Sequence, residues 1–287
     1  AGMPDRPSVL YGHFLYPSGA AVVEMASMLG ILSIVAVGEG TFWTVEPFGY
    51  PKAIQDFRNA SGLIPGSNVL KRSLMTNLNS PEEKIRVMPT GVNRTLFSPR
   101  DRSAMRRRFG FPEDKFIIAF NGHFDENKGP HRLLAAVQDL DNIGLIFMGE
   151  GDLELDSPDI LFKGVLQHAH VPEMLSAADI FVLPTMLEGS CNAIIEALAC
   201  GLPVVTSEGE FNDDIVDDNV AIRIDPSDVV QIRTAILSLY RDEQLRKKMS
   251  SNALAKIKNY DLTLRASNIL AWIKEMRNGS TKDDDLR

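Results

Sequence analysis

The chain has 287 residues, of which 44% are hydrophobic and 24% charged, a composition typical of a globular protein with one large or two modest domains. Its net charge of −8 argues against a nucleic-acid partner, because phosphate backbones are bound through lysine and arginine. The longest apolar stretch, residues 28–37, is too short to cross a bilayer, so we expect no transmembrane segment.

Short apolar runs alternate with helical patterns along nearly the whole chain. They predict strands at residues 9–14, 33–37, 84–88, 116–121, 144–148, 160–162, 179–183, 203–206 and 221–224. Several of these runs are apolar on both faces, as expected of a parallel sheet covered by helices. Pro130 and Pro172 mark helix starts, and Gly30 and Gly201 mark helix ends. The pattern predicts a doubly wound α/β architecture.

The same pattern suggests how the chain divides. A boundary near residue 98 separates a partial N-terminal Rossmann-like domain, residues 1–98, from a complete one, residues 99–260. A helix over residues 261–277 follows, and residues 278–287 are expected to form a disordered polar tail. The arginines within residues 100–108 are interpreted as a solvated helix face.

The two cysteines, Cys191 and Cys200, fall at opposite ends of one expected helix. At the helical rise they lie about 13 Å apart, which is too far for a disulfide. Unpaired thiols suit a reducing compartment, and no basic, apolar leader opens the chain. We therefore expect a cytoplasmic protein.

One segment that carries chemistry follows the expected strand 179–183. Loops at the carboxyl end of such strands hold ligands in α/β sheets. The next helix is apolar on nearly every side except at Glu196, and a carboxylate there is costly unless it is hydrogen-bonded or paired. Ser190 is the expected N-cap, which leaves backbone amides for a phosphate or a sugar hydroxyl. Alternatively, Glu188 is an ordinary loop acid and Glu196 a core residue satisfied by neighbouring backbone.

A second candidate loop follows the expected strand 116–121 and ends where Pro130 opens a helix. Gly122 permits a tight turn, and His123 and Lys128 bring positive charge close to a helix N-terminus. This arrangement suits a diphosphate, although a surface lysine and a loop histidine explain the same residues. Neither loop matches the P-loop or the Gly-x-Gly-x-x-Gly fingerprint, which disfavours P-loop NTPases and ordinary dehydrogenases.

Other features of the sequence are less specific. His168 and His170 alternate with no third ligand nearby, and no Asp-x-Asp pair follows a strand, so the sequence predicts no metal site. Trp43 and Phe48 either line an acceptor site or pack against their own domain.

Four runs together resemble the family 4 retaining glycosyltransferases, whose GT-B fold pairs two Rossmann-like, doubly wound parallel-sheet domains. The most specific is Glu188-Gly-Ser-Cys-Asn-Ala-Ile-Ile-Glu196 with the Ala-Leu-Ala-Cys-Gly-Leu-Pro-Val-Val that follows it. The others are Ala178-Asp-Ile-Phe-Val-Leu-Pro-Thr, Lys84-Ile-Arg-Val-Met-Pro-Thr-Gly-Val-Asn-Arg-Thr-Leu-Phe and His13-Phe-Leu-Tyr-Pro-Ser-Gly. The similarity covers almost the whole chain.

The resemblance implies an enzyme that moves a hexose-type unit from a nucleoside diphosphate sugar to an acceptor hydroxyl of a glycan or lipid-linked saccharide. No metal or other cofactor is implied. The first domain would be the acceptor side, residues 99–260 would bind the donor, and the helix 261–277 would pack back towards the first domain. Work in polysaccharide biosynthesis, with peripheral membrane association, would suit such an acceptor.

The resemblance also assigns roles to residues. Glu196 would bind the donor ribose, Glu188 the transferred sugar, and Lys128 the leaving diphosphate. The remaining donor contacts would come from His123, Gly122, Gly189, Ser190, Cys191, Asn192, Gly164 and Val165. Of these, Gly164 and Val165 would lie near the base.

Three departures from the family pattern bear on activity. His123 stands where the family usually has arginine, which makes that diphosphate contact weaker and pH-sensitive. Gly38-Glu39-Gly40 replaces the usual His-Gly pair that positions the sugar. The family also begins well before anything that matches residues 9–14, so about a third to a half of the first domain is expected to be missing. A catalytically inactive nucleotide-sugar-binding or scaffold protein is therefore the alternative function.

Overall fold

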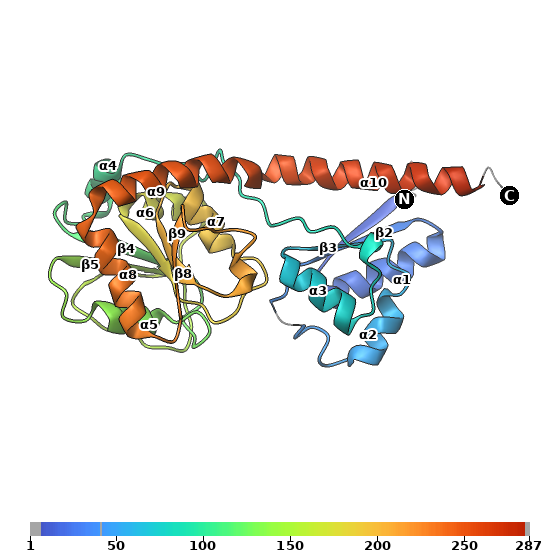
Figure 1. The fold of residues 1–287 in the computed structure, drawn as a ribbon, viewed down its shortest axis with the longest axis horizontal. Helices are drawn as coiled ribbons and strands as arrows, with labels where there is room; N and C mark the ends of the chain where they lie inside the picture. Colours follow the sequence, from blue (N-terminus) through green and yellow to red (C-terminus); the bar gives the residue numbers. More distant parts are fainter. Residues whose placement is uncertain (1–6, 41, 285–287) are drawn as a thin grey trace. The chain divides into compact units, whose positions relative to one another are not determined.

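The computed structural model describes residues 7–40 and 42–284, which fold into two compact units (Figure 1). Unit 1 comprises Ala1–Pro89 together with Leu187–Ser190 and Gly209–Asp214. Unit 2 comprises Thr90–Met186, Cys191–Glu208 and Ile215–Arg287. Each unit has its own hydrophobic core, one around Leu63 and Leu74 and the other around Ile118 and Phe181.

Unit 1 contains a three-stranded parallel sheet in the order β1-β2-β3. Its strands are β1 (Val9–His13), β2 (Leu32–Val37) and β3 (Gly62–Pro65). Its helices are α1 (Ala20–Leu29), α2 (Tyr50–Phe57) and α3 (Asn68–Asn77), with a π-helical turn η1 (Leu15–Gly19) before α1 and a 3-10 turn η2 (Glu82–Lys84) after α3. As expected, α1 ends at Gly30, which adopts the left-handed conformation with φ of 61°.

Two expectations for unit 1 are corrected. Strand β3 was not expected, because a four-residue run bounded by glycine and proline gives little strand signal. The expected strand 84–88 is reduced to one isolated bridge, between Leu63 and Ile85. The amides of Arg86 and Met88 donate to carbonyls of β3, but Pro65 has no N–H with which to return a bond. Without that bond, the regular ladder stops.

Unit 2 contains a six-stranded parallel sheet in the order β6-β5-β4-β7-β8-β9. Its strands are β4 (Phe116–Asn121), β5 (Ile143–Met148), β6 (Ile160–Gly164), β7 (Ile180–Leu183), β8 (Val204–Ser207) and β9 (Ala221–Ile224). Numbered within the unit, the order is 3-2-1-4-5-6, that of a Rossmann-type doubly wound sheet. The order reverses between β4 and β7.

Helices cover both faces of this sheet (Figure 1). Helices α5 and α8 pack together, and α4, α6, α7 and α9 make a second set of contacts. Their bounds are α4 (Arg102–Phe109), α5 (Pro130–Val137), α6 (Val171–Ala177), α7 (Asn192–Ala199), α8 (Val229–Arg241) and α9 (Glu243–Lys256). Unit 2 also contains two 3-10 turns, η3 (His168–His170) and η5 (Ile257–Tyr260), while η4 (Glu210–Asn212) lies in unit 1.

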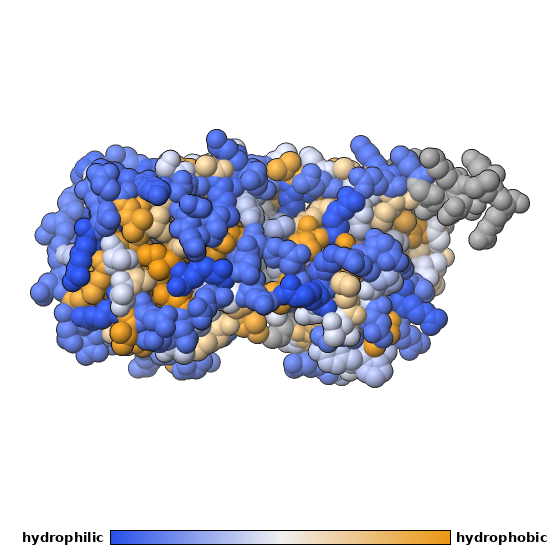
Figure 2. Space-filling view, in the orientation of Figure 1, coloured by the Kyte–Doolittle hydropathy of each residue, from blue (hydrophilic) through white to orange (hydrophobic). Residues whose placement is uncertain are grey.

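The last helix, α10 (Leu262–Asp284), is longer than expected. The segment expected as a disordered tail from residue 278 is helical up to Asp284, since no proline interrupts the backbone hydrogen bonds there. Hydrophilic residues predominate on the face of the molecule shown in Figure 2. Among the helices of the described residues, none has a stretch long and apolar enough to cross a bilayer.

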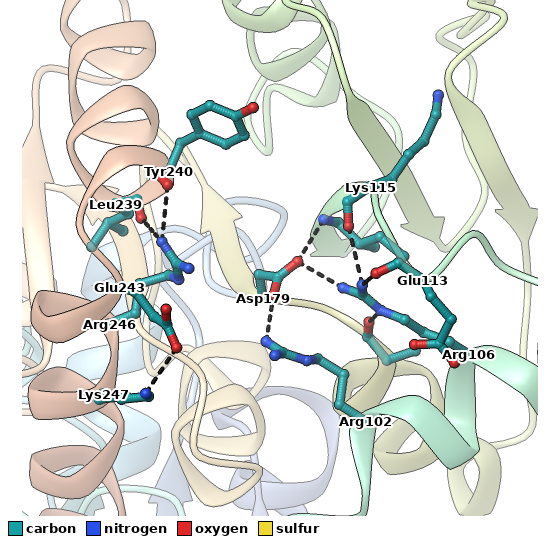
Figure 3. A network of polar contacts seen from close by, with 12 residues as sticks. Arg102, Arg106, Glu113, Lys115, Asp179, Leu239, Tyr240, Glu243, Arg246 and Lys247 are labelled. Carbon is teal, nitrogen blue, oxygen red and sulfur yellow. Dashed lines mark hydrogen bonds and ion pairs between the residues drawn. The ribbon is translucent and has the colours of Figure 1, made fainter.

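Arg102, Arg107 and Arg108 are exposed, as expected of a solvated helix face, but α4 turns Arg106 inwards. Arg106 is 4% exposed and its guanidinium lies 2.7 Å from the buried carboxylate of Asp179, which also pairs with Arg102 (Figure 3). Arg106 donates further hydrogen bonds to the carbonyls of Ala177, Glu113 and Lys115. The same Asp179 carboxylate accepts a hydrogen bond from the Ile117 amide of β4 at 2.7 Å. This network joins α4 to the amino ends of β4 and β7.

Replacing Arg106 with alanine should therefore destabilise unit 2. It leaves the Asp179 carboxylate buried with only the exposed Arg102 as a cationic partner, and breaking a buried ion pair costs about 3–5 kcal/mol. The matched control is Arg107→Ala on the same helix, whose ion pair with Glu113 is exposed and is worth about 0–1 kcal/mol. Urea unfolding measures both. Equal losses for the two variants would contradict this account.

Candidate functional site

The carboxyl ends of β4 and β7 meet where the strand order of unit 2 reverses. Strand β4 pairs with β5 on one side and with β7 on the other. The two loops singled out in the sequence leave the sheet at these two strand ends. In open α/β sheets ligands bind in the crevice at such a point.

The loop after β4 places Lys128 beside Gly122. An added side-chain carbon on Gly122 would lie 3.6 Å from the aliphatic stem of Lys128, so the lysine runs alongside the turn. The Lys128 amide donates to the Asp125 carboxylate at 2.7 Å, while the His123 side chain is exposed. Gly122, His123 and Lys128 therefore share one loop at the carboxyl edge of the sheet.

Arg132, on the first turn of α5, ties this loop to the end of β7. Its guanidinium donates to the carbonyls of Glu126 at 2.8 Å and Asn127 at 3.3 Å, and to the Pro184 carbonyl after β7 at 2.8 Å. The Asn127 carbonyl also accepts from the Met186 amide at 2.8 Å. Arg132 is buried, and desolvation lowers the pKa of its guanidinium. Nothing in the spacing of the sequence indicated this role.

Glycine is required at position 129, where the Arg132 side chain lies against the backbone. Gly129 has φ of 68°, and an added side-chain carbon there would lie 2.2 Å from the Arg132 guanidinium. The loop after β5 is equally tight, since a carbon on Gly149 would lie 2.0 Å from the Gly122 carbonyl oxygen, and one on Gly151 2.5 Å from a backbone oxygen of Phe124. The glycines after β5 therefore support the Lys128 loop through backbone contacts.

The second loop leads into α7, which begins one residue later than expected. Cys191, not Ser190, is the N-cap, because it is the residue with extended backbone dihedrals before the first helical residue, Asn192. It makes no side-chain capping bond, and neither does Gly129 at the start of α5. Two helix N-termini without side-chain caps thus lie at the same edge of the sheet, an arrangement suited to anions.

Glu196 projects from the second turn of α7, and its side chain is 14% exposed. Burial raises the pKa of its carboxyl, and the nearby His168 partly opposes that rise. His168 Nε2 lies 3.0 Å from Glu196 Oε1. The carboxylate is thus paired with a side chain, and no backbone group of the described residues donates to it.

His168 was considered in the sequence only as a metal ligand. It lies in η3, directly after β6, where Gly164 ends the strand and the exposed Val165 follows. Its contact with Glu196 joins residues 28 positions apart, so only the fold could reveal it. Among the described residues, no group of three histidine, cysteine or acidic side chains is placed to hold a metal ion.

Glu188, Gly189 and Ser190 group with unit 1, whereas the other candidate residues belong to unit 2. Unit 1 also contains Glu39, from the segment Gly38-Glu39-Gly40 that departs from the pattern of the family it resembles. Glu39 is 2% exposed, and its carboxylate accepts hydrogen bonds from the Leu15 amide at 2.6 Å, the Gly38 amide at 3.0 Å and the Thr44 hydroxyl at 3.0 Å. This carboxylate is used to fix loops of its own unit.

The loop aromatics of unit 1 behave differently from each other. Trp43 is 61% exposed, whereas Phe48 stacks on the buried ring of Tyr16 with ring centroids 4.3 Å apart. Of the two interpretations of these residues, packing against their own domain therefore fits Phe48 better than Trp43.

Solved structures of other proteins resemble this fold closely. HepE from Anabaena, crystallised in complex with UDP, superimposes with a TM-score of 0.81 at 18% identity over 93% of this chain and 79% of that one. Sucrose-phosphate synthase from Thermosynechococcus elongatus gives a TM-score of 0.81 at 18% identity over 95% of this chain and 74% of that one. The GT-B-type α/β fold expected from the sequence is confirmed.

Sequence relatives point the same way. TuaC of Bacillus subtilis (strain 168), named provisionally as a teichuronic acid biosynthesis glycosyltransferase, is 27% identical over 84% of this chain and 63% of its own length. CapM of Staphylococcus aureus, a capsular polysaccharide biosynthesis glycosyltransferase, is 27% identical over 70% of this chain and 57% of its own. The chain spans between about half and two thirds of the length of the first such relatives.

The sequence profile described as "Glycosyl transferases group 1" matches residues 101–256. The match takes in all six strands of unit 2 and both loops at the point where the strand order reverses. Because it covers more than half of the sequence, the chain belongs to the Glycosyl transferases group 1 family.

Proposed function

We propose that the chain acts as a retaining glycosyltransferase that moves a hexose-type unit from a nucleoside diphosphate sugar to an acceptor hydroxyl. The observation that carries this proposal is the meeting of the Lys128 loop and the Glu196 helix at one edge of a Rossmann-ordered sheet. One supplies a cation and the other a nearly buried carboxylate. A nucleoside diphosphate needs both, for its phosphates and for its ribose.

Each part of the donor has a matching group. Lys128 and the uncapped first turn of α5 suit the diphosphate. Glu196 suits the two ribose hydroxyls, because an ionised carboxylate accepts from both. Gly164 and Val165 at the end of β6 suit the base, and HepE, which shares this fold, was crystallised with UDP. A uridine donor is therefore the first to test.

The transferred sugar would be held by Glu188 and by amides from Gly189 to Asn192, as the family resemblance implies. When the bond from the anomeric carbon to the diphosphate breaks, the electron pair stays on the leaving oxygen. Lys128 and the helix amides stabilise that charge. The acceptor hydroxyl attacks the anomeric carbon from the same face, and its proton passes to the departing diphosphate oxygen. Because attack and departure take place on one face, the anomeric configuration is retained.

A binding protein without catalysis is the second candidate, favoured by Glu39. Its carboxylate is held by three donors of unit 1, in the place of the histidine that would position the sugar. Glycan or lipid-linked saccharide acceptors are proposed from the names of relatives such as CapM. Incubation with UDP-sugars and an acceptor lipid extract separates the candidates, since only the enzyme releases UDP. The anomeric configuration of the product, read by NMR, tests retention.

Lys128→Ala should weaken UDP binding at least tenfold, because a lysine–phosphate contact is a charge-assisted hydrogen bond worth about 1.5–3 kcal/mol. Calorimetry with UDP, GDP and ADP measures the affinity. The matched control is Lys115→Ala, since Lys115 precedes β4 at the opposite edge of the sheet and pairs with Asp159. If neither wild type nor variant binds any of the three at millimolar concentration, the donor proposal is wrong.

Glu196→Gln should weaken donor binding by about 1–3 kcal/mol, the range of hydrogen bonds to a charged group. The melting temperature should change little, because the amide keeps the shape of the side chain. Affinity and melting temperature are measured on the same variant. An unchanged affinity with a lowered melting temperature would assign Glu196 to the core.

UDP binding should be unaffected by excess chelator. In the described residues no ligand cluster for a divalent ion occurs, and Lys128 with helix amides carries the phosphate charge. Calorimetry in EDTA and in Mg²⁺ tests this directly. A large loss of affinity in EDTA would require a metal bound together with the donor.

A further inference from the structure

The imidazole of His168 lies against the carboxylate proposed to bind the donor ribose. Its Nε2 is 3.0 Å from Glu196 Oε1. Among the described residues, His168 is the only polar partner of the Glu196 side chain. One carboxylate oxygen is thus engaged by the protein, and the second remains for a ligand.

The position of the imidazole is fixed from a second side. The ring of Phe97, itself 2% exposed, packs on His168 with ring centroids 5.0 Å apart and an interplanar angle of 54°. The turn η3 that carries His168 begins directly after the loop of Gly164 and Val165. Glu196 and Phe97 therefore contact the His168 ring from two sides, although its side chain is 66% exposed.

We propose that His168 is a positioning residue for the donor: it holds one oxygen of Glu196 and directs the other towards the ribose hydroxyls. This inference rests on the proposed function, in which Glu196 binds the ribose. His168 itself is assigned no contact with the reacting atoms.

The surrounding charges support this role. Burial raises the pKa of the Glu196 carboxyl, and His168 is the one group that lowers it, by its hydrogen bond and by its charge. Cys200, the C-cap residue of α7, stays a neutral thiol because burial and Glu196 raise its pKa to about 12. Among the described residues on elements that pack against α7, Glu173 of α6 pairs with Arg100, Arg108 and His170. None of these acts on Glu196.

The sign of the pH effect follows from these contacts. Only an ionised carboxylate accepts hydrogen bonds from both ribose hydroxyls, so donor affinity falls as pH drops through the pKa of Glu196. Removing His168 leaves the raising effect of burial unopposed, and the fall in affinity then begins at a higher pH. At a pH well above the pKa of Glu196 in both proteins, only the orientation of the carboxylate is lost.

The test compares His168→Ala and His168→Gln with His170→Ala, using UDP and calorimetry between pH 5.5 and pH 8. His170 is the matched control, because it lies in the same turn but pairs with Glu173. We expect His168→Ala to weaken binding about three- to tenfold at pH 8, the scale of an exposed charged hydrogen bond, and by a larger factor at pH 6. His168→Gln keeps a donor and should recover part of the loss at pH 8, whereas His170→Ala should bind as wild type does.

A second measurement needs no donor. Titration of the Glu196 carboxyl carbon by NMR, with the signal assigned through Glu196→Gln, should give a higher pKa in His168→Ala than in wild type. An unchanged titration overturns the proposal, and so does a loss of affinity by the same factor at every pH. A changed titration in a protein that binds no nucleoside diphosphate would leave the His168–Glu196 pairing intact and overturn the proposed function instead.

Discussion

The candidate site depends on how β4 and β7 are held side by side, because they pair through only two residues of each strand. At the amino ends, the Asp179 carboxylate accepts from the Ile117 amide and is neutralised by the buried Arg106. At the carboxyl ends, Arg132 joins the carbonyls of Asn127 and Pro184. Two buried guanidinium groups thus hold together the two strands at which the order reverses. The positions of the Lys128 loop and of the loop that leads to Glu196 depend on these strands.

Much of the arrangement of the unit 2 sheet and its loops can be predicted from the sequence. Runs apolar on both faces predicted the parallel sheet of unit 2, and Pro130 and Gly201 marked a helix start and a helix end, as the structure confirms. The placement of Gly122, Lys128 and Glu196 at one edge followed, because the carboxyl ends of parallel strands share an edge. These features are encoded over a few neighbouring residues, so a single segment suffices to predict them.

What the sequence did not predict arises from contacts between distant segments. The burial of Arg106 depends on Asp179, 73 positions away, and the partner of Glu196 lies in a turn that suggested only metal binding. Strand β3 was missed because four residues bounded by glycine and proline have no periodicity to detect. The loss of the strand at residues 84–88 follows from one missing amide on its neighbour, Pro65, which no local pattern records.

The two tight glycines after β5 affect how variation near the site can be interpreted. Gly149 and Gly151 have φ of 140° and 157°, and any side chain there would collide with the backbone of Gly122 and Phe124. A library of random variants selected only for soluble expression would already be depleted at both positions. Intolerance to substitution at these two positions reports the close approach of the backbone. A mutational scan that treats every invariant position near the site as catalytic would therefore assign these two glycines a chemical role that they do not have.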